Sequence, residues 1–167
     1  MDMEERAGRK HIRLQNYNYN TPGVYFLTIC VENRRCLLSR IKGEGILAEP
    51  EVELSPYGEI AEKYINQLND FYQNLSVESY VIMPNHIHVL LAVKAEISLR
   101  ETTKQNSAVS RFVSTFKRFC NKEYGHNIWQ ARSYDHVIRD QADFDQHLCY
   151  IYENPFGWTK DELYSAE

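Results

Sequence analysis

Hydrophobic and polar positions follow two periods along this chain, and the two periods predict its secondary structure. Runs of β-branched and aromatic residues predict strands, and apolar residues spaced three and four apart predict helices. In chain order the predicted elements are strand 24–31, helix 56–71, strands 75–84 and 86–94, helix 107–121, short strand 134–139 and helix 141–153. Residues 36–55 and 95–106 are predicted to be loops, the first with a short extended piece.

This order of elements indicates an α+β fold. Two adjacent strands after the first helix should pair antiparallel, which suits a ferredoxin-like antiparallel sheet with helices packed on one side. A length of 167 residues fits a single domain over residues 1–167. Its first part, about residues 1–21, mixes basic and aromatic residues and is predicted to be an irregular arm.

The chain is organised around residues 80–91, where apolar runs flank His86 and His88. Side chains alternate between the faces of a strand, so both histidines should point the same way, with Cα atoms about 6.6 Å apart. Two imidazoles at this spacing can converge on one metal ion. The alternative is a half-buried strand that carries two histidines without a ligand.

The last predicted helix places four polar residues on one flank of its apolar stripe. At 100° per residue, Asp143, His147, Tyr150 and Asn154 cluster together, whereas Tyr152 falls on the opposite flank. This grouping becomes informative when it is joined to the histidine pair.

The net charge of −4 argues against a generic nucleic-acid binder, but the charge is unevenly distributed. Residues 1–42 carry eight basic and four acidic residues, and residues 100–139 carry eight and three, whereas the two other segments are acidic. Within the second basic block, Arg111, Arg118 and Lys122 recur on one side of the helix. They form either a DNA-binding ridge or a solvated helix face.

The chain carries no sign of export or membrane insertion. It has no apolar run near the ~20 residues that span a bilayer and no signal peptide at its start, so we expect a cytoplasmic protein without a membrane partner. Its four cysteines are too scattered for a zinc site or a disulfide framework.

An ordered set of motifs resembles one known family. These motifs are Val81–His88, Trp129–Gln130, His136–Asp140 and Tyr150–Pro155, within a similarity that runs from about Tyr25 to Trp158. Together they are similar to the small single-tyrosine HUH transposases, and most closely to the REP-associated tyrosine transposases of the insertion-sequence-200 type.

The resemblance implies a ferredoxin-like nuclease domain and roles for individual residues. His86 and His88 match the metal ligands, Tyr150 the nucleophile, and Asn154 a third polar ligand. The metal implied is Mg²⁺ or Mn²⁺, although imidazoles would also suit Zn²⁺, Ni²⁺ or Cu²⁺. The substrate implied is single-stranded DNA, with a hairpin, cleaved and rejoined through a 5′-phosphotyrosine; relatives work as monomers or homodimers.

Two further motif residues are candidates for DNA contact. Trp129 is a candidate for stacking on a base and equally for packing in the core. Arg139 either touches phosphate or supports the fold. Asp143 and His147 are weak candidates for helping Tyr150 to lose its proton, and each also has an ordinary structural interpretation.

Two other functions stay open from the sequence. A non-catalytic DNA-binding protein that retains the fold would suit the acidic overall charge. A metal-dependent hydrolase of small substrates would use a metal-bound water and would not need Tyr150.

Overall fold

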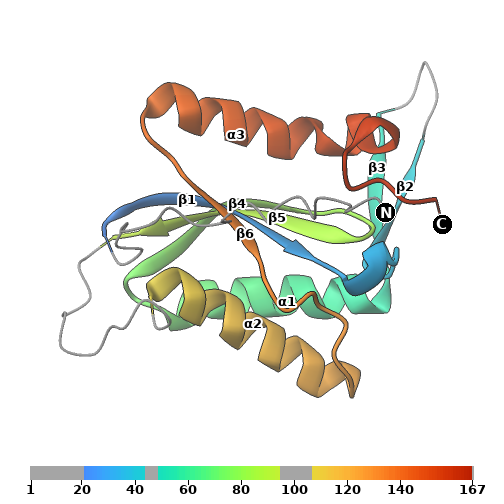
Figure 1. The fold of residues 1–167 in the computed structure, drawn as a ribbon, viewed down its shortest axis with the longest axis horizontal. Helices are drawn as coiled ribbons and strands as arrows, with labels where there is room; N and C mark the ends of the chain where they lie inside the picture. The colour runs from blue at the N-terminus through green and yellow to red at the C-terminus, as the bar shows by residue number, and fades with distance from the viewer. Residues whose placement is uncertain (1–20, 44–48, 95–106, 167) are drawn as a thin grey trace, which may run out of the picture.

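The computed structural model describes residues 21–43, 49–94 and 107–166, which form a sheet with helices on both faces (Figure 1). The elements, with their bounds, are β1 (Gly23–Cys30), the 3-10 helix η1 (Glu32–Arg34), β2 (Ser39–Lys42), β3 (Glu51–Leu54), α1 (Pro56–Phe71), β4 (Leu75–Ile82), β5 (His86–Val93), α2 (Ala108–Tyr124), β6 (Tyr134–Val137), α3 (Gln141–Glu153) and the 3-10 helix η4 (Asn154–Lys160).

The main sheet confirms the predicted ferredoxin-like arrangement. Its strand order is β4-β5-β1-β6, and each neighbouring pair is antiparallel. Strands β1, β4, β5 and β6 with helices α1 and α2 give the order strand, helix, strand, strand, helix, strand, which is the ferredoxin-like pattern. The two central strands, β5 and β1, are therefore the ones that any site on this sheet would use.

Strand β5 is covered on both faces, and this explains its nearly unbroken apolar sequence. The side chains of Ile87, Val89, Leu91 and Val93 belong to the large core beneath the sheet. Leu90 belongs instead to a smaller core with Phe26 of β1 and Ile151 of α3. Because the faces alternate, His86 and His88 lie on the same face as Leu90, toward α3.

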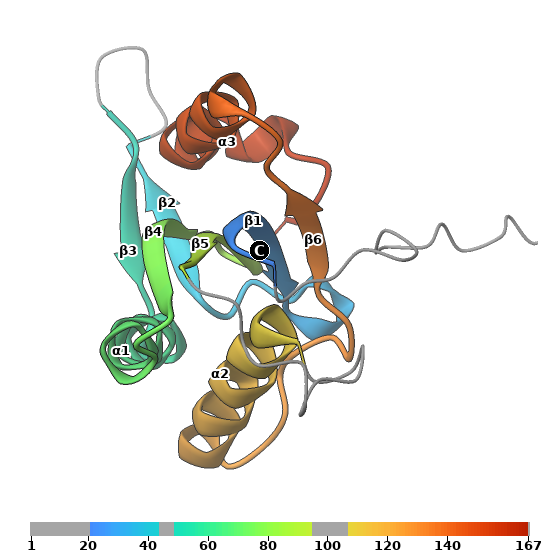
Figure 2. The same ribbon diagram turned by 90° about the vertical axis from the view of Figure 1, so that its left-hand side faces the viewer.

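The prediction that the helices cover one side of the sheet is wrong. Figure 2 shows α1 and α2 together on one face and α3 alone on the other. The apolar stripe of α3 is short, and Ile151 is its one buried residue. This stripe is sufficient to hold α3 against Phe26 and Leu90, and it puts the flank of Tyr150 near the histidine face.

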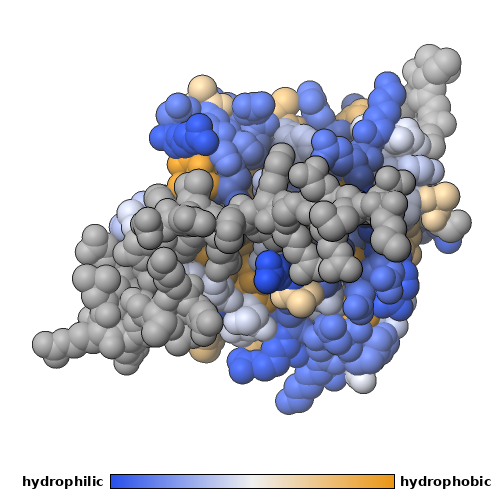
Figure 3. Space-filling model, in the orientation of Figure 1, coloured by the Kyte–Doolittle hydropathy of each residue, from blue (hydrophilic) through white to orange (hydrophobic). Residues whose placement is uncertain are grey.

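Local capping signals set the starts of the helices within one residue of the predicted positions, whereas α2 ends at Tyr124, three residues beyond the predicted end. Ser55 caps α1 by accepting a hydrogen bond from Gly58 N at 3.2 Å, and Ser107 caps α2 by accepting one from Ser110 N at 3.1 Å. Asp140 caps α3 in the same way, with Asp143 N at 2.8 Å. Figure 3 shows mainly hydrophilic side chains over the outer helix surfaces in that view, as expected for helices that bury one stripe.

The segment before α1 holds more structure than the predicted loop. Strands β2 and β3 pair as a separate antiparallel two-stranded sheet. The chain there approaches α1 so closely that a Cβ on Gly58 would lie 2.0 Å from the backbone oxygen of Leu38. Glycine at position 58 therefore has a steric reason, which the sequence pattern does not reveal.

Three further sequence predictions concern the expected arm and loop, the cysteines and membrane insertion. The arm over residues 1–21 and the loop over residues 95–106 lie outside the described residues, apart from Thr21. All four cysteines are free. Among the helices described, none is long and apolar enough to cross a bilayer.

Candidate functional site

Two buried histidines lie side by side at the start of β5. His86 is opposite Cys30 of β1 and His88 is opposite Thr28, so both sit in the middle of the sheet. Their ring centroids are 4.6 Å apart, and the two side chains are 0% and 3% exposed. The period-two prediction of a shared face is therefore met by the geometry.

One nitrogen of each imidazole is already engaged by a neighbouring side chain. His86 Nδ1 lies 2.8 Å from Asn85 Oδ1, and His88 Nδ1 lies 2.9 Å from Thr28 Oγ1. Asn85 is itself fixed, because its amide donates to the backbone oxygen of Leu163 at 2.7 Å. Such outer contacts orient an imidazole and leave Nε2 as the free ring nitrogen.

Burial keeps both imidazoles neutral near pH 7. It lowers the pKa of His86 to about 4, against a smaller raising effect of the Asp161 charge and of the Asn154 amide. The pKa of His88 is also well below its usual value, first because of burial and second because two protonated imidazoles so close together would repel each other. Neutral imidazoles carry the lone pairs that metal ions bind.

Helix α3 brings Tyr150 and Asn154 to this histidine pair. The Tyr150 ring centroid is 5.2 Å from that of His88, with the ring edge-on. Asn154 is 4% exposed, and its Nδ2 donates to Asp161 at 3.1 Å, which leaves Oδ1 for another partner. Tyr152, the other tyrosine in the last turn of α3, is 68% exposed and lies on the opposite flank of the helix.

Three unpartnered atoms test whether these residues fit a metal ion. His86 Nε2, His88 Nε2 and Asn154 Oδ1 are all buried, and each lacks a hydrogen-bond partner in the described part of the chain. Leaving three such atoms unpaired is costly unless something binds them. Two imidazole nitrogens and one amide oxygen are a donor set that divalent ions accept, so the residues present fit the group.

Asp161 joins the site from the segment that follows η4. Its Oδ2 accepts hydrogen bonds from Tyr150 Oη at 3.4 Å and from Asn154 Nδ2 at 3.1 Å. Sequence analysis missed this residue, because a lone acid in a polar C-terminal segment carries no pattern. Asn85 and Thr28 were also missed as orienting residues, although Asn85 stands inside the motif.

The Tyr150 phenol is protonated at neutral pH. Its pKa is raised, mainly by burial and then by the charge on Asp161. A protonated phenol is a weak nucleophile, so a reaction at Tyr150 needs help in removing the proton.

A cavity of about 870 Å³ opens beside the tyrosine, between α3 and the β1–β6 edge. Its lining includes Phe26, His88, His147 and Tyr150, together with Arg132 and Gln130 from the segment before β6. The sequence prediction did not single out Arg132, which supplies a positive charge at this wall. Tyr150 is 43% exposed and is therefore reachable from the cavity.

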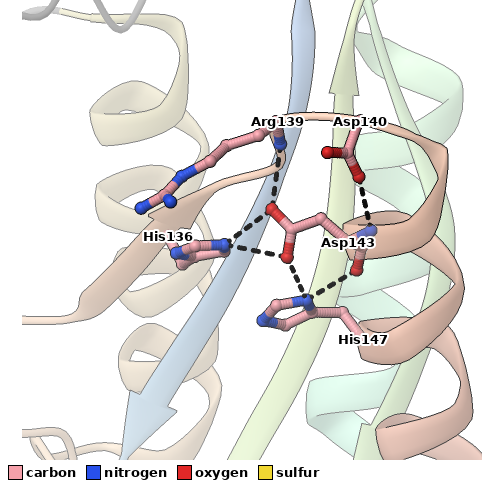
Figure 4. Close-up of polar contacts among 5 residues, drawn as sticks. All are labelled: His136, Arg139, Asp140, Asp143 and His147. Carbon is pink, nitrogen blue, oxygen red and sulfur yellow. Dashed lines mark hydrogen bonds and ion pairs between the residues drawn. The ribbon is translucent and has the colours of Figure 1, made fainter.

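A second polar cluster holds the other end of α3 (Figure 4). The Asp143 carboxylate lies 3.0 Å from His136 Nε2 and 3.0 Å from His147 Nδ1, and it accepts a bond from Arg139 N at 2.9 Å. These three side chains also have donor atoms close enough for a metal ion. Here, however, His136 Nε2 and His147 Nδ1 already contact the oxygens of Asp143. The three unpartnered atoms beside Tyr150 have no such contact among the described residues.

This cluster connects to the histidine pair through a row of rings. His136 stacks on His147 at 4.7 Å, His147 lies 4.7 Å from Phe26, and Phe26 stacks on His88 at 4.9 Å. The cluster therefore helps to set where α3, and with it Tyr150, lies against the sheet.

We expect Asp143→Asn to destabilise the protein by about 1 kcal/mol or more, because the charge-assisted hydrogen bonds from His136 Nε2 and Arg139 N are weakened, together with the 3.0 Å contact to His147 Nδ1. Urea unfolding followed by circular dichroism measures this. The matched control is Asp145→Asn on the same helix, whose carboxylate accepts from Gln141 Nε2 and from no other described residue; its effect should stay within about 0.5 kcal/mol. Equal effects would contradict the anchoring role of the cluster.

The structure does not bring the predicted basic ridge to this site. Arg111, Arg118 and Lys122 lie on α2, which covers the face of the sheet opposite α3 (Figure 2). Arg139 lies beside the Asp143 cluster, with its backbone nitrogen bonded there.

The suggestion that Trp129 stacks on a base is corrected by its burial. The side chain is 1% exposed and packs against Phe116, with ring centroids 5.4 Å apart. No ring face is open to a base, so the packing alternative holds.

The sheet, the histidine pair on a central strand and the tyrosine on a facing helix resemble the single-tyrosine HUH class. No family model matches the chain. An uncharacterized protein of Haemophilus influenzae is 31% identical over 173 residues, covering 93% of each chain. The REP-associated tyrosine transposase of Escherichia coli is 28% identical over 144 residues, covering 85% of this chain and 73% of that protein.

The fold has a solved counterpart. A REP-associated tyrosine transposase bound to a REP hairpin superposes with a TM-score of 0.62 at 23% identity, covering 89% of this chain and 76% of the other. The chain is related to the REP-associated tyrosine transposases. This relationship supports a DNA-processing role of the transposase type.

Proposed function

We propose that this chain cleaves and rejoins single-stranded DNA by transesterification, with Tyr150 as the nucleophile. The observation that carries the proposal is the placement of Tyr150 against His88, where three buried atoms have no partner among the described residues. A hydrolase of small substrates would not need a reachable tyrosine at this position. A binding protein that has lost catalysis would not need to keep the whole donor set.

In the proposed step one oxygen–phosphorus bond forms and another breaks, so no energy-rich co-substrate is needed. The Tyr150 oxygen attacks a backbone phosphorus, an O–P bond forms to tyrosine, and the bond from phosphorus to the 3′-oxygen breaks. The phenol proton leaves and the 3′-oxygen gains a proton. The product is a 5′-phosphotyrosine and a free 3′-hydroxyl, and attack by another 3′-hydroxyl reverses the step and rejoins strands.

Three residues would hold a divalent ion, which we propose is Mg²⁺ or Mn²⁺. They are His86, His88 and Asn154, whose Nε2, Nε2 and Oδ1 atoms are buried and have no hydrogen-bond partner among the described residues. When bound, such an ion polarises the scissile phosphate and offsets the negative charge that builds on its oxygens. Asn85 and Thr28 orient the two imidazoles for this task.

We further propose that the DNA partner carries a hairpin and that its single-stranded part enters the cavity beside Tyr150. The cavity has the exposed ring of Tyr134 and the charge of Arg132 in its wall, which suit a base and a phosphate. The solved counterpart is bound to a REP hairpin. Residues 1–167 would act as one domain in this reaction.

A denaturing gel tests the proposal. The purified protein is incubated with end-labelled single-stranded hairpin DNA from the flanks of its own gene, with Mn²⁺ or with EDTA. A labelled adduct of protein size that requires Mn²⁺ supports strand transfer. Binding of these DNAs without cleavage or adduct, with metal in the site, would favour the DNA-binding alternative. Metal-dependent cleavage without an adduct would favour a hydrolase.

A further inference from the structure

Asp161 is held in place by its own backbone surroundings. Its backbone nitrogen donates to Trp158 O at 3.0 Å, and its Oδ1 accepts from Leu163 N at 2.7 Å. Trp158, 4% exposed, packs beside the His86 ring at 6.0 Å between centroids. The carboxylate is therefore not a mobile surface group, and its position against the histidines is a property of the fold.

The carboxylate lies within reach of a shared ligand. One donor atom each from His86, His88 and Asp161 lies within 4.8 Å of the others. In a six-coordinate site with bonds of about 2.1 Å, opposite donors are about 4.2 Å apart. The three side chains need only small shifts to meet one ion of this kind.

The charge at this place has no basic partner in the part of the chain that the structure describes. Within the described residues, no lysine or arginine forms an ion pair with Asp161. The adjoining His86 Nε2, His88 Nε2 and Asn154 Oδ1 are buried, and none has a hydrogen-bond partner among the described residues. A carboxylate beside these donor atoms has the electrostatics of a cation site.

We infer that Asp161 is a fourth protein ligand of the divalent ion, alongside His86, His88 and Asn154. The inference rests on the proposed function, and it adds a residue that the sequence motifs do not contain. A carboxylate oxygen has lone pairs enough to bind an ion and still accept from Asn154 Nδ2. A set of two nitrogens and two oxygens favours harder ions more than imidazoles alone do.

Direct Mn²⁺ binding to the full chain tests this assignment. Electron paramagnetic resonance of free Mn²⁺ gives the dissociation constant for the wild type and for Asp161→Asn, which keeps the shape but loses the charge. We expect at least about tenfold weaker Mn²⁺ binding in the variant, since even the loss of a residue that only contacts a ligand lowers metal affinity by about 10- to 100-fold. Wild-type affinity in Asp161→Asn would overturn the ligand role.

A matched control separates ligation from general electrostatics. Glu162→Gln removes the same charge one residue away, and Glu162 lines the same cavity. Its Mn²⁺ affinity should stay close to that of the wild type. If Glu162→Gln weakens Mn²⁺ binding as much as Asp161→Asn does, the assignment of Asp161 as a ligand fails.

A second readout distinguishes a ligand from a residue that only orients Asn154. Competition with Zn²⁺ gives the ratio of the two affinities for each protein. Losing a carboxylate should reduce Mn²⁺ affinity more than Zn²⁺ affinity, because nitrogen donors hold Zn²⁺ well. A loss that is equal for both ions would overturn the inference and point to misplacement of the site.

Failure of this inference and failure of the proposed function give different results. If the wild type forms the covalent adduct but Asp161→Asn binds Mn²⁺ normally, only the fourth ligand is wrong. If Mn²⁺ binding behaves as expected but no hairpin DNA yields an adduct, the ligand assignment stands and the strand-transfer proposal is wrong.

Discussion

Replacing Tyr150 with phenylalanine should abolish the covalent protein–DNA adduct and leave the fold unchanged. The phenol oxygen is the atom that would bond to phosphorus, and its hydrogen bond to Asp161 is long, at 3.4 Å. Removing it costs little packing, since the ring stays against Phe26 and His88. Removing a catalytic nucleophile commonly lowers the reaction rate by more than about a thousandfold. The adduct should therefore fall below detection on a denaturing gel.

The matched control for this variant is Tyr152→Phe. Tyr152 is two residues away on the same helix but 68% exposed on the opposite flank. It should give the adduct at the wild-type level and the same thermal unfolding midpoint. An adduct that survives Tyr150→Phe and disappears in Tyr152→Phe would contradict the assignment.

His88→Ala should weaken Mn²⁺ binding and abolish the increase in adduct yield that Mn²⁺ produces. The variant loses one of the two buried Nε2 atoms that face the site. We expect at least about tenfold weaker Mn²⁺ binding, because losing a ligand costs no less than losing an outer-sphere contact. Calorimetric titration gives the affinity, and the gel assay gives the adduct yield with added Mn²⁺.

Because His88 is buried in the sheet, its variant needs checks on folding. Circular dichroism should show the same secondary structure, with an unfolding midpoint below that of the wild type from the lost packing. His126→Ala is the control: this histidine is exposed and lies in the loop after α2. Wild-type Mn²⁺ affinity in a folded His88→Ala protein would rule out a metal site at these histidines.

The features that could be predicted from the sequence are the periodic and local ones. Alternation in β5 places His86 and His88 on one face, and helical spacing places Tyr150 and Asn154 on one flank. The helices predicted at residues 56–71 and 141–153 begin at those positions, each after a capping residue, Ser55 and Asp140. Each of these signals depends on neighbours within about one helical turn, a distance that a sequence pattern can describe.

The features that could not be predicted depend on contacts between distant segments. Asp161 meets Tyr150 only because η4 turns the chain back toward β5, and no spacing rule marks that turn. The side on which α3 packs depends on Phe26 and Leu90, which read as ordinary strand residues. Trp129 sits in a motif, yet its burial is decided by α2.

The most direct test of the central claim is to locate the bond between protein and DNA. After adduct formation with Mn²⁺, protease and nuclease digestion leaves a peptide that carries a nucleotide, and tandem mass spectrometry identifies the modified residue. We predict the modification on the Tyr150 oxygen, within the peptide that contains Asn154. A nucleotide on any other residue, Tyr152 included, would contradict the account.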